Sequence, residues 1–164
     1  MMTLRILAVC AGNICRSPTA AAAIAAAAAE AGLDVAVDSA GTGAWNLGEP
    51  PHPHAVAAAG IVGLEPQGKA RRVHSRDFER FDIIVAMDRS NLADLHAIAP
   101  SLEARAKVRL FATYDKGAEL EEIADPYGGP EEGYTRMVEA ILPAAAGLVD
   151  SLLAVAGEGP IAGE

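Results

Sequence analysis

Aliphatic runs alternate along the chain with stretches whose apolar residues recur every three or four positions. Residues 4–9 form an aliphatic run with one polar interruption, bounded by Gly12, and this predicts a buried strand. Shorter runs at residues 35–37, 81–86 and 108–111 predict three more strands. Between residues 39 and 53 the sequence is rich in Gly and Pro, which is typical of a loop.

Helices are expected between these strands. Ser17 is a good N-cap and Pro18 suits the first helical position, so we expect an Ala-rich helix that ends before Gly32. A helix is expected through residues 56–59, and another is expected after Asp88 or Ser90 as its cap. The last helix carries an apolar stripe at spacings of three and four, and Pro143 inside it should kink or divide it. Its members are Tyr134, Met137, Val138, Ile141, Leu142, Ala145, Leu148, Leu152 and Val155.

Strands that alternate with helices imply right-handed crossovers, and therefore a parallel sheet covered on both faces. The expected fold class is a single three-layer α/β domain. With 164 residues the chain fits one domain, which we assign to residues 1–157, and the Gly/Glu-rich residues 158–164 are expected to be a disordered tail. Ligands of such sheets bind at the carboxyl ends of the strands, so the loop after the first strand is the first place to look for a site.

Charge and composition narrow the classes of partner. The net charge of −9 would repel polyanions, so we expect neither nucleic-acid binding nor membrane insertion, and any anion must be held by a local positive site. Two cysteines, Cys10 and Cys15, are too few for a disulfide scaffold. With no secretory signal pattern in the sequence given, the expected location is the cytoplasm.

The segment after the first strand, Cys10-Ala11-Gly12-Asn13-Ile14-Cys15-Arg16-Ser17-Pro18, can form an anion cradle. Its small and turn-forming residues let successive N–H groups converge on one point, and the following helix directs its positive end there. Arg16 adds a planar fork that can hold two oxygens of a phosphoryl group. The predicted phosphate-binding residues are Ala11, Gly12, Asn13, Ile14, Cys15 and Ser17, together with Arg16.

Cys10, at the end of the strand, would lie at the floor of this cradle. The surrounding dipoles and Arg16 favour an anion there, so we expect Cys10 to be a thiolate nucleophile that attacks phosphorus in line. Ser17 can donate its hydroxyl to the sulfur when it leaves. Asp125, fixed beside Pro126, is the candidate general acid, and the loop aromatics Trp45 and Tyr127 are candidate walls for a planar substrate ring.

At these residues the sequence closely resembles the low-molecular-weight protein tyrosine phosphatase family. The resemblance covers residues 10–18, 38–42, 45–46, 70–71, 77–78, 81–82, 87–92 and 125–127. It implies a flavodoxin-like four-stranded parallel sheet, no metal or cofactor, and substrate contacts from Trp45, Asn46 and Tyr127. It also implies that Cys10 is the nucleophile, Arg16 the phosphate binder and Asp125 the general acid. Gly68 and Gly128 stand where the family often has His and Tyr.

Hydrolysis of phosphotyrosine in proteins, with inorganic phosphate as the product and a monomer as the active form, is therefore the leading hypothesis. Arsenate reduction, phosphoarginine hydrolysis and a non-catalytic anion or partner-binding module are the alternatives. Related arsenate reductases use further cysteines downstream, and this chain has none after Cys15. Related arginine phosphatases carry Thr at the place of Ile14, so Ile14 favours tyrosine. Cys15 is either simply buried or the redox partner of Cys10.

The sequence contains two further sets of polar residues, one basic and one of histidines. Lysine and arginine gather at Lys69, Arg71, Arg72 and Arg76. Three roles are compatible with this group: a solvated face, a docking site for an acidic phosphopeptide, or support of the fold. The four histidines do not complete a metal-ligand set with thiolates or carboxylates, so we interpret them as surface residues.

Overall fold

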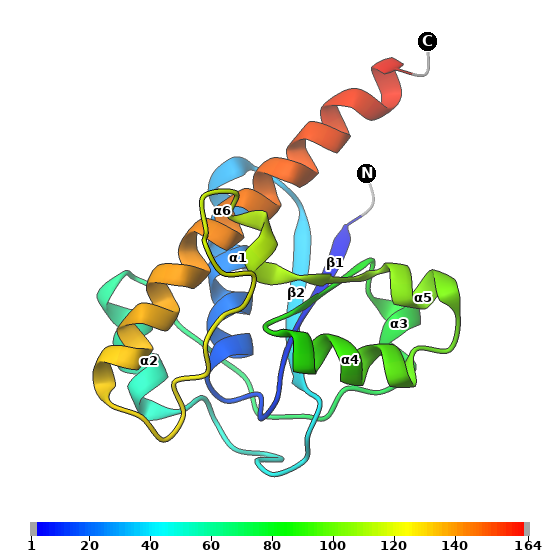
Figure 1. Ribbon diagram of the computed structural model, residues 1–164. Helices are drawn as coiled ribbons and strands as arrows, with labels where there is room; N and C mark the ends of the chain where they lie inside the picture. Colours follow the sequence, from blue (N-terminus) through cyan, green and yellow to red (C-terminus); the bar gives the residue numbers. More distant parts are fainter. Residues whose placement is uncertain (1–2, 163–164) are drawn as a thin grey trace.

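Four parallel strands form the centre of the molecule. The structure, a computed structural model, describes residues 3–162. The strands are β1 (Leu4–Cys10), β2 (Val35–Gly41), β3 (Ile83–Ala86) and β4 (Val108–Leu110), in the order β2-β1-β3-β4 (Figure 1). The fold is thus the single α/β domain with a four-stranded parallel sheet that the sequence predicts, and β1 lies in its interior.

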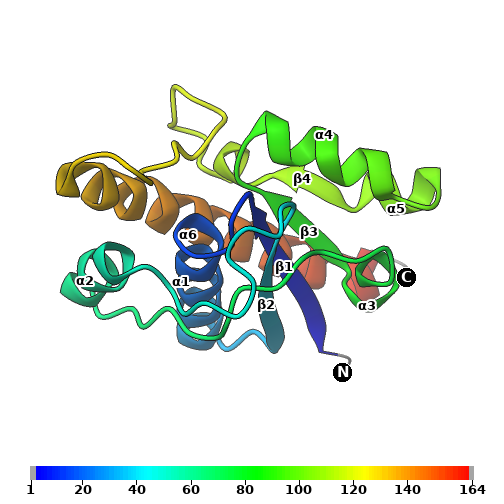
Figure 2. The same ribbon diagram turned by 90° about the horizontal axis from the view of Figure 1, so that it is seen from below.

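Helices cover both faces of this sheet. One face carries α1 (Arg16–Ala31), α2 (Pro53–Ile61) and α6 (Glu131–Ala162), and the other carries α3 (Asp77–Arg80), α4 (Arg89–Ile98) and α5 (Leu102–Ala106) (Figure 2). The three-layer arrangement follows from the right-handed crossovers that parallel strands require.

The two cores meet at β1. Ile6 and Ala8 belong to the core under α1 and α6, whereas Leu7 and Val9 belong to the core under α4 and α5. Successive side chains of a strand point to opposite faces, so a strand buried on both faces needs an unbroken apolar run, as β1 has. The carboxyl end of β1, at Cys10, is therefore held from both sides.

Helix α1 begins two residues earlier than predicted, at Arg16 instead of Pro18, and Ser17 is not its cap. The N-cap is Cys15, which makes no side-chain cap hydrogen bond, and Ser17 lies inside the first turn with its hydroxyl directed elsewhere. The predicted end is confirmed, because Gly32 adopts the left-handed conformation at φ 71° that favours glycine at a helix C-terminus.

Several element boundaries differ from the predictions. Strand β2 continues to Gly41 and so extends into the expected loop, and β3 starts only at Ile83, because the residues just before it form α3 and its cap. The helices α3 and α5 and the 3-10 turn η1 (Phe111–Tyr114) are too short to show an apolar period. Of the two caps considered for α4, Asp88 is the one used, since its side chain accepts the N–H of Asn91.

Helix α6 is one continuous helix, so Pro143 does not divide it. Pro143 itself is exposed, and the buried residues on either side of it, including Ile141 and Leu148, keep the helix packed against the core. From Glu131 to Ala156 the helix has the length and hydropathy of a bilayer span. Its buried stripe, which includes Ile141 and Leu148, packs in the core.

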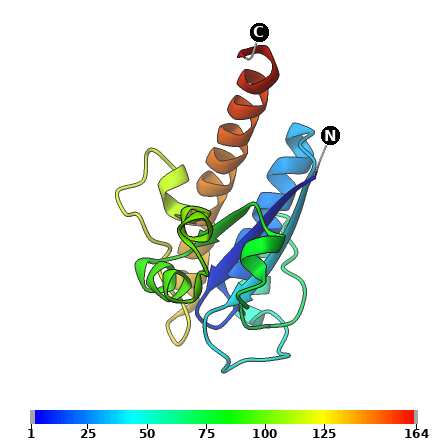
Figure 3. The same ribbon diagram turned by 90° about the vertical axis from the view of Figure 1, so that its right-hand side faces the viewer.

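The far end of α6 extends past the sheet (Figure 3). Its bounds reach Ala162, so part of the expected tail has helical backbone, and residues 163–164 lie outside the described part. The domain boundary at residue 157 stays a prediction.

Candidate active site

Residues 10–16, called here the Cys10 loop, connect the end of β1 to the start of α1. Three backbone hydrogen bonds from neighbouring segments hold this loop: Thr42 N–H to the Cys10 carbonyl (2.9 Å), Gly43 N–H to the Ala11 carbonyl (3.0 Å) and His52 N–H to the Ile14 carbonyl (2.8 Å). The loop is the floor of a pocket of about 390 Å³. The pocket is lined by Cys10, Ala11, Gly12, Asn13, Ile14, Cys15, Arg16, Trp45, Asn46, Asp125 and Tyr127. All the predicted site residues except Ser17 therefore face one cavity.

The Cys10 sulfur is nearly buried and sits among hydrogen-bond donors. Its side chain is 3% exposed, the Asn13 N–H points at the sulfur from 3.2 Å, and the Ser17 hydroxyl lies 3.0 Å away. Ser17 thus contacts the sulfur as predicted, although it does not line the pocket. Donors at these distances stabilise negative charge on sulfur.

Asn13 holds the Cys10 loop in its shape. It has φ 59°, in the left-handed region that Asn tolerates better than most residues. Its amide donates to the hydroxyls of Ser17 (2.8 Å) and Ser39 (2.9 Å), and its carbonyl oxygen accepts the Arg71 N–H (2.9 Å). The side chain is thereby connected to α1, β2 and the segment before α3. The Asn13 side chain keeps these partners although Gly68 stands where the phosphatase family that the sequence resembles often has His.

Arg16 is buried and fixed by partners outside the Cys10 loop. Its Nη1 donates to Asp88 Oδ2 (2.6 Å) and to the Ile123 carbonyl (2.9 Å), and its Nη2 lies 3.8 Å from Asp125 Oδ2. From its place in the sequence Asp88 is expected as a helix cap, and its contact with Arg16 is not predicted. The cap position was a signal, because a cap at the carboxyl end of β3 lies at the same edge of the sheet as Cys10.

Asp125 and the two loop aromatics form the open rim of the pocket. Asp125 belongs to residues 115–130, called here the Asp125 loop; its side chain is 51% exposed, and its Oδ1 accepts the Tyr127 N–H at 3.1 Å. Trp45 and Tyr127 are exposed, as expected for substrate walls. Asn46 donates to the Gly12 carbonyl at 3.2 Å, and a Cβ at Gly12 would come within 2.5 Å of that amide, so a larger residue there would displace the Asn46 side chain.

His52 is a further residue of this region that the sequence analysis did not recognise. It is half-buried, not a surface residue, and its ring stacks on the buried Tyr134 with centroids 5.3 Å apart. It also meets the Tyr127 ring edge-on at 5.8 Å. Its Nδ1 accepts the His54 N–H, so it is the side-chain cap of α2 as well. Only its position before Pro53 could have indicated that cap.

The second cysteine differs from Cys10 in its surroundings. Burial raises the pKa of Cys15 from 9.0 to about 12, with smaller contributions from Asp125 and Cys10. Burial also raises the pKa of its neighbour Tyr134 from 10.0 to about 12, and Cys15 contributes to that shift. Both groups are therefore neutral at neutral pH. Among the described residues, no three His, Cys, Asp or Glu side chains are grouped so that they could hold a metal ion.

A parallel α/β sheet whose first strand ends in a buried cysteine, with an N–H and a hydroxyl near its sulfur and a buried arginine beside it, is typical of a cysteine-dependent phosphatase. Residues 5–156 match the family model described as low molecular weight phosphotyrosine protein phosphatase, and the chain belongs to this family. A low molecular weight protein-tyrosine-phosphatase of Streptomyces coelicolor is 40% identical over 153 residues, which cover 90% of this chain and 93% of that protein.

Solved structures agree with this assignment. The crystal structure of a protein tyrosine phosphatase from Entamoeba histolytica, with Hepes in the active site, superposes with a TM-score of 0.90 at 30% identity and covers 93% of this chain and 98% of that one. The YwlE arginine phosphatase, a Bacillus subtilis protein, superposes with a TM-score of 0.80 at 26% identity, over 92% of this chain and 96% of that one; in that structure the active-site serine of a mutant is phosphorylated.

Proposed function

We propose that this protein hydrolyses phosphotyrosine in proteins through a cysteinyl-phosphate intermediate on Cys10. The observation that carries the proposal is the position of the Cys10 sulfur at the floor of an open pocket, with an N–H and a hydroxyl directed at it. The N–H groups of residues 11–15 and the Arg16 guanidinium bind the three non-bridging oxygens of the phosphoryl group. Fixed donors of this kind stabilise the charge that spreads over those oxygens in the transition state.

In the first step the Cys10 thiolate attacks phosphorus, and the bond between phosphorus and the tyrosine oxygen breaks. Asp125, as the carboxylic acid, gives its proton to that oxygen, so neutral tyrosine leaves. The position of Asp125 at the rim supports this role, because the leaving group must point out of the pocket when phosphorus lies over Cys10.

In the second step water attacks phosphorus and the bond between sulfur and phosphorus breaks. Asp125, now a carboxylate, accepts the proton from the water, and inorganic phosphate is released. The Ser17 hydroxyl, 3.0 Å from the sulfur, stabilises the departing thiolate.

The walls of the pocket favour an aromatic ester. Trp45 and Tyr127 are large, exposed rings on opposite loops, suited to either side of a phenyl ring, and Asn46 and Ile14 complete the lining. Ile14 is apolar, which favours tyrosine over the phosphoguanidinium group that the YwlE relative is named for. We further propose that the enzyme acts as a monomer in the cytoplasm and uses no metal or cofactor.

The test is a turnover comparison of peptides of identical sequence that carry phosphotyrosine, phosphoserine or phosphoarginine. We expect kcat/KM for the phosphotyrosine peptide to exceed the other two by roughly 100-fold or more, because a pocket built for one group rejects others by such factors. Preference for phosphoarginine would replace the proposal with the arginine phosphatase alternative. Absence of turnover with all three peptides would leave an anion-binding module.

A further inference from the structure

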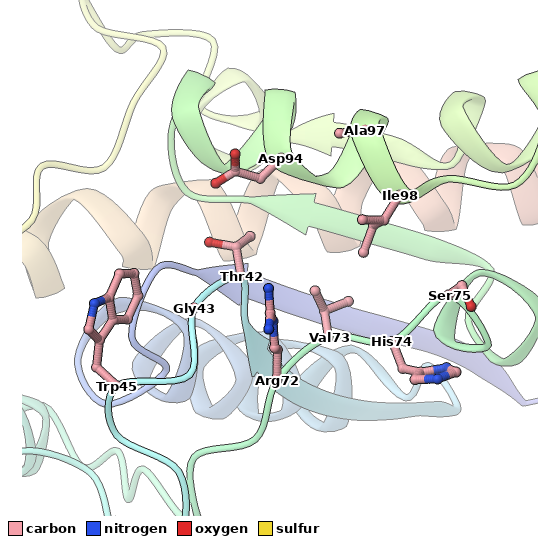
Figure 4. A pocket seen from close by; sticks show the side chains of 10 residues that line it. All are labelled: Thr42, Gly43, Trp45, Arg72, Val73, His74, Ser75, Asp94, Ala97 and Ile98. Carbon is pink, nitrogen blue, oxygen red and sulfur yellow. The ribbon is translucent and has the colours of Figure 1, made fainter.

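A second groove lies directly beside the pocket that contains Cys10. It has a volume of about 730 Å³ and runs between α4 and the segments after β2 and before α3 (Figure 4). It is lined by Thr42, Gly43, Trp45, Arg72, Val73, His74, Ser75, Asp94, Ala97 and Ile98. Trp45 lines both cavities. A chain bound in one cavity can therefore continue past this ring into the other.

The groove is fixed to the same backbone as the Cys10 loop. Thr42 and Gly43, on one side of it, donate their N–H groups to the carbonyls of Cys10 and Ala11. The segment that carries Arg72 is attached to β2, because the Val73 N–H donates to the Gly41 carbonyl at 2.8 Å. The separation between a phosphate over Cys10 and a side chain in the groove is thus set by the fold.

The charge of the groove distinguishes it from the opposite rim of the active site. In the basic segment 69–76, Arg71 is committed to Asp38 and Asp77, so it buttresses the fold. Arg72 is exposed, has no ion pair among the side chains that the structure describes, and extends toward the α4 wall (Figure 4). Asp94 is the one carboxylate that lines the groove.

The opposite rim is acidic. It carries the half-exposed carboxylate of Asp125, and the whole chain has a net charge of −9. Earlier in the same loop, Glu121 is paired with Arg89 at 2.9 Å. An acidic side chain of a substrate is therefore repelled from the Asp125 loop and attracted to Arg72.

We propose that this groove binds the residues that flank the phosphotyrosine of a substrate, and that Arg72 recognises an acidic side chain on one side of it. The inference rests on the proposed function, whose substrate class it narrows. Val73 and Ile98 offer apolar contact to the stem of a glutamate while the guanidinium holds its carboxylate. Arg72 is then a specificity-determining residue outside the catalytic pocket.

The experiment measures the preference for glutamate over glutamine around the phosphotyrosine. Each peptide of the series carries one Glu or one Gln at a single position, from three residues before to three residues after the phosphotyrosine. For the wild type we expect kcat/KM to be about fivefold higher with Glu at positions on one side only, the scale of an exposed charge pair. Arg72→Gln should bring this ratio to one. Arg76→Gln removes an equal charge from the same segment outside the groove, and should keep the ratio.

Two further variants reverse or strengthen the effect. Arg72→Glu should make the enzyme prefer Lys over Gln at the same position, and Asp94→Asn should raise the preference for Glu. A Glu/Gln ratio that is equal in the wild type and in Arg72→Gln, or a loss of the ratio in Arg76→Gln as well, overturns the inference.

Failure of the proposed function would be visible separately. It would show as a lack of turnover of p-nitrophenyl phosphate and of every peptide by the wild type. Binding of the same peptides, followed by the fluorescence of Trp45, the only tryptophan, would then still give the Glu/Gln affinity ratio that decides the role of Arg72.

Discussion

The two loops that meet over the carboxyl ends of the strands are built in opposite ways. The Cys10 loop is buried, its polar side chains have partners, and two neighbouring segments donate three backbone hydrogen bonds to its carbonyls. The Asp125 loop is held to the rest of the molecule mainly around Ile123, whose N–H donates to the Met87 carbonyl and whose own carbonyl accepts from Arg16. Residues 124–130 bond within themselves, at Tyr127 to Asp125 and at Gly129 to Pro126.

This difference separates two tasks of the reaction. Transition-state charge must be met by donors that are already in place, because donors that reorient during the step lose much of their effect. The proton donor has to serve a leaving group and then a water molecule, so it gains from an open position at the rim. Single substitutions in each loop test whether the two loops divide the work in this way.

The largest expected effect is that of Cys10→Ser. Turnover of a phosphotyrosine peptide should fall by more than roughly 10⁴-fold, because the serine hydroxyl is not ionised and is a far weaker nucleophile. Binding of the peptide, followed by Trp45 fluorescence, should stay within about threefold of the wild type, since the N–H groups and Arg16 are unchanged. A variant that loses binding along with turnover would show that the anion cradle depends on the sulfur itself.

Asp125→Asn should have the next largest effect. We expect kcat for a phosphotyrosine peptide to fall by about 10²- to 10⁴-fold, the usual contribution of a general acid. With p-nitrophenyl phosphate, whose leaving group needs little protonation, the loss should be about tenfold. Phosphate binding should be unaffected. Equal losses with both esters would remove Asp125 from the acid role.

The smallest effect concerns Cys15, which lies inside the buried Cys10 loop. Its folded-state pKa lies above its ordinary value, and the same holds for Tyr134, so both retain protons that the unfolded chain has already lost. Their contribution to the free energy of unfolding should therefore be complete below pH 9. It should be lost as the pH rises from 9 toward 12.

Cys15→Ala provides the control for this prediction. It should lower the free energy of unfolding by about 1 kcal/mol at pH 7, and the gap to the wild type should close as the pH rises. Urea denaturation at a series of pH values measures both effects. Parallel curves for the two proteins up to pH 11 would contradict the assignment of the alkaline loss to Cys15.

The sequence predicts the fold and the Cys10 loop well because both depend on local signals. The unbroken apolar run of β1, the Gly32 stop of α1 and the spacing from Cys10 to Arg16 are each set within a few residues, and the structure brings the predicted lining residues into one cavity. Its place beside Pro126 made Asp125 a candidate acid, but mainly the resemblance to the phosphatase family linked it to a loop more than a hundred residues earlier.

The features that were missed depend on long-range packing. His52 becomes half-buried only because α6 brings Tyr134 beneath it, and Arg72 faces a groove only because α4 forms the other wall. Ser17 was predicted as a helix cap because serine is a common N-cap residue. In the fold its hydroxyl instead contacts the Cys10 sulfur and accepts a hydrogen bond from the Asn13 amide. Such contacts join segments that are far apart in the sequence, so local sequence patterns do not predict them.

Asp88 joins two parts of the molecule through a single carboxylate. One oxygen accepts the Asn91 N–H and caps α4, and the other holds the buried Arg16 guanidinium. Directed evolution of a more stable enzyme should therefore tolerate few substitutions at this position, since a replacement that improves the helix cap also changes the contact that orients Arg16. Ser101, which caps α5 through the Ala104 N–H at a distance from the pocket, is the better starting point for such a library.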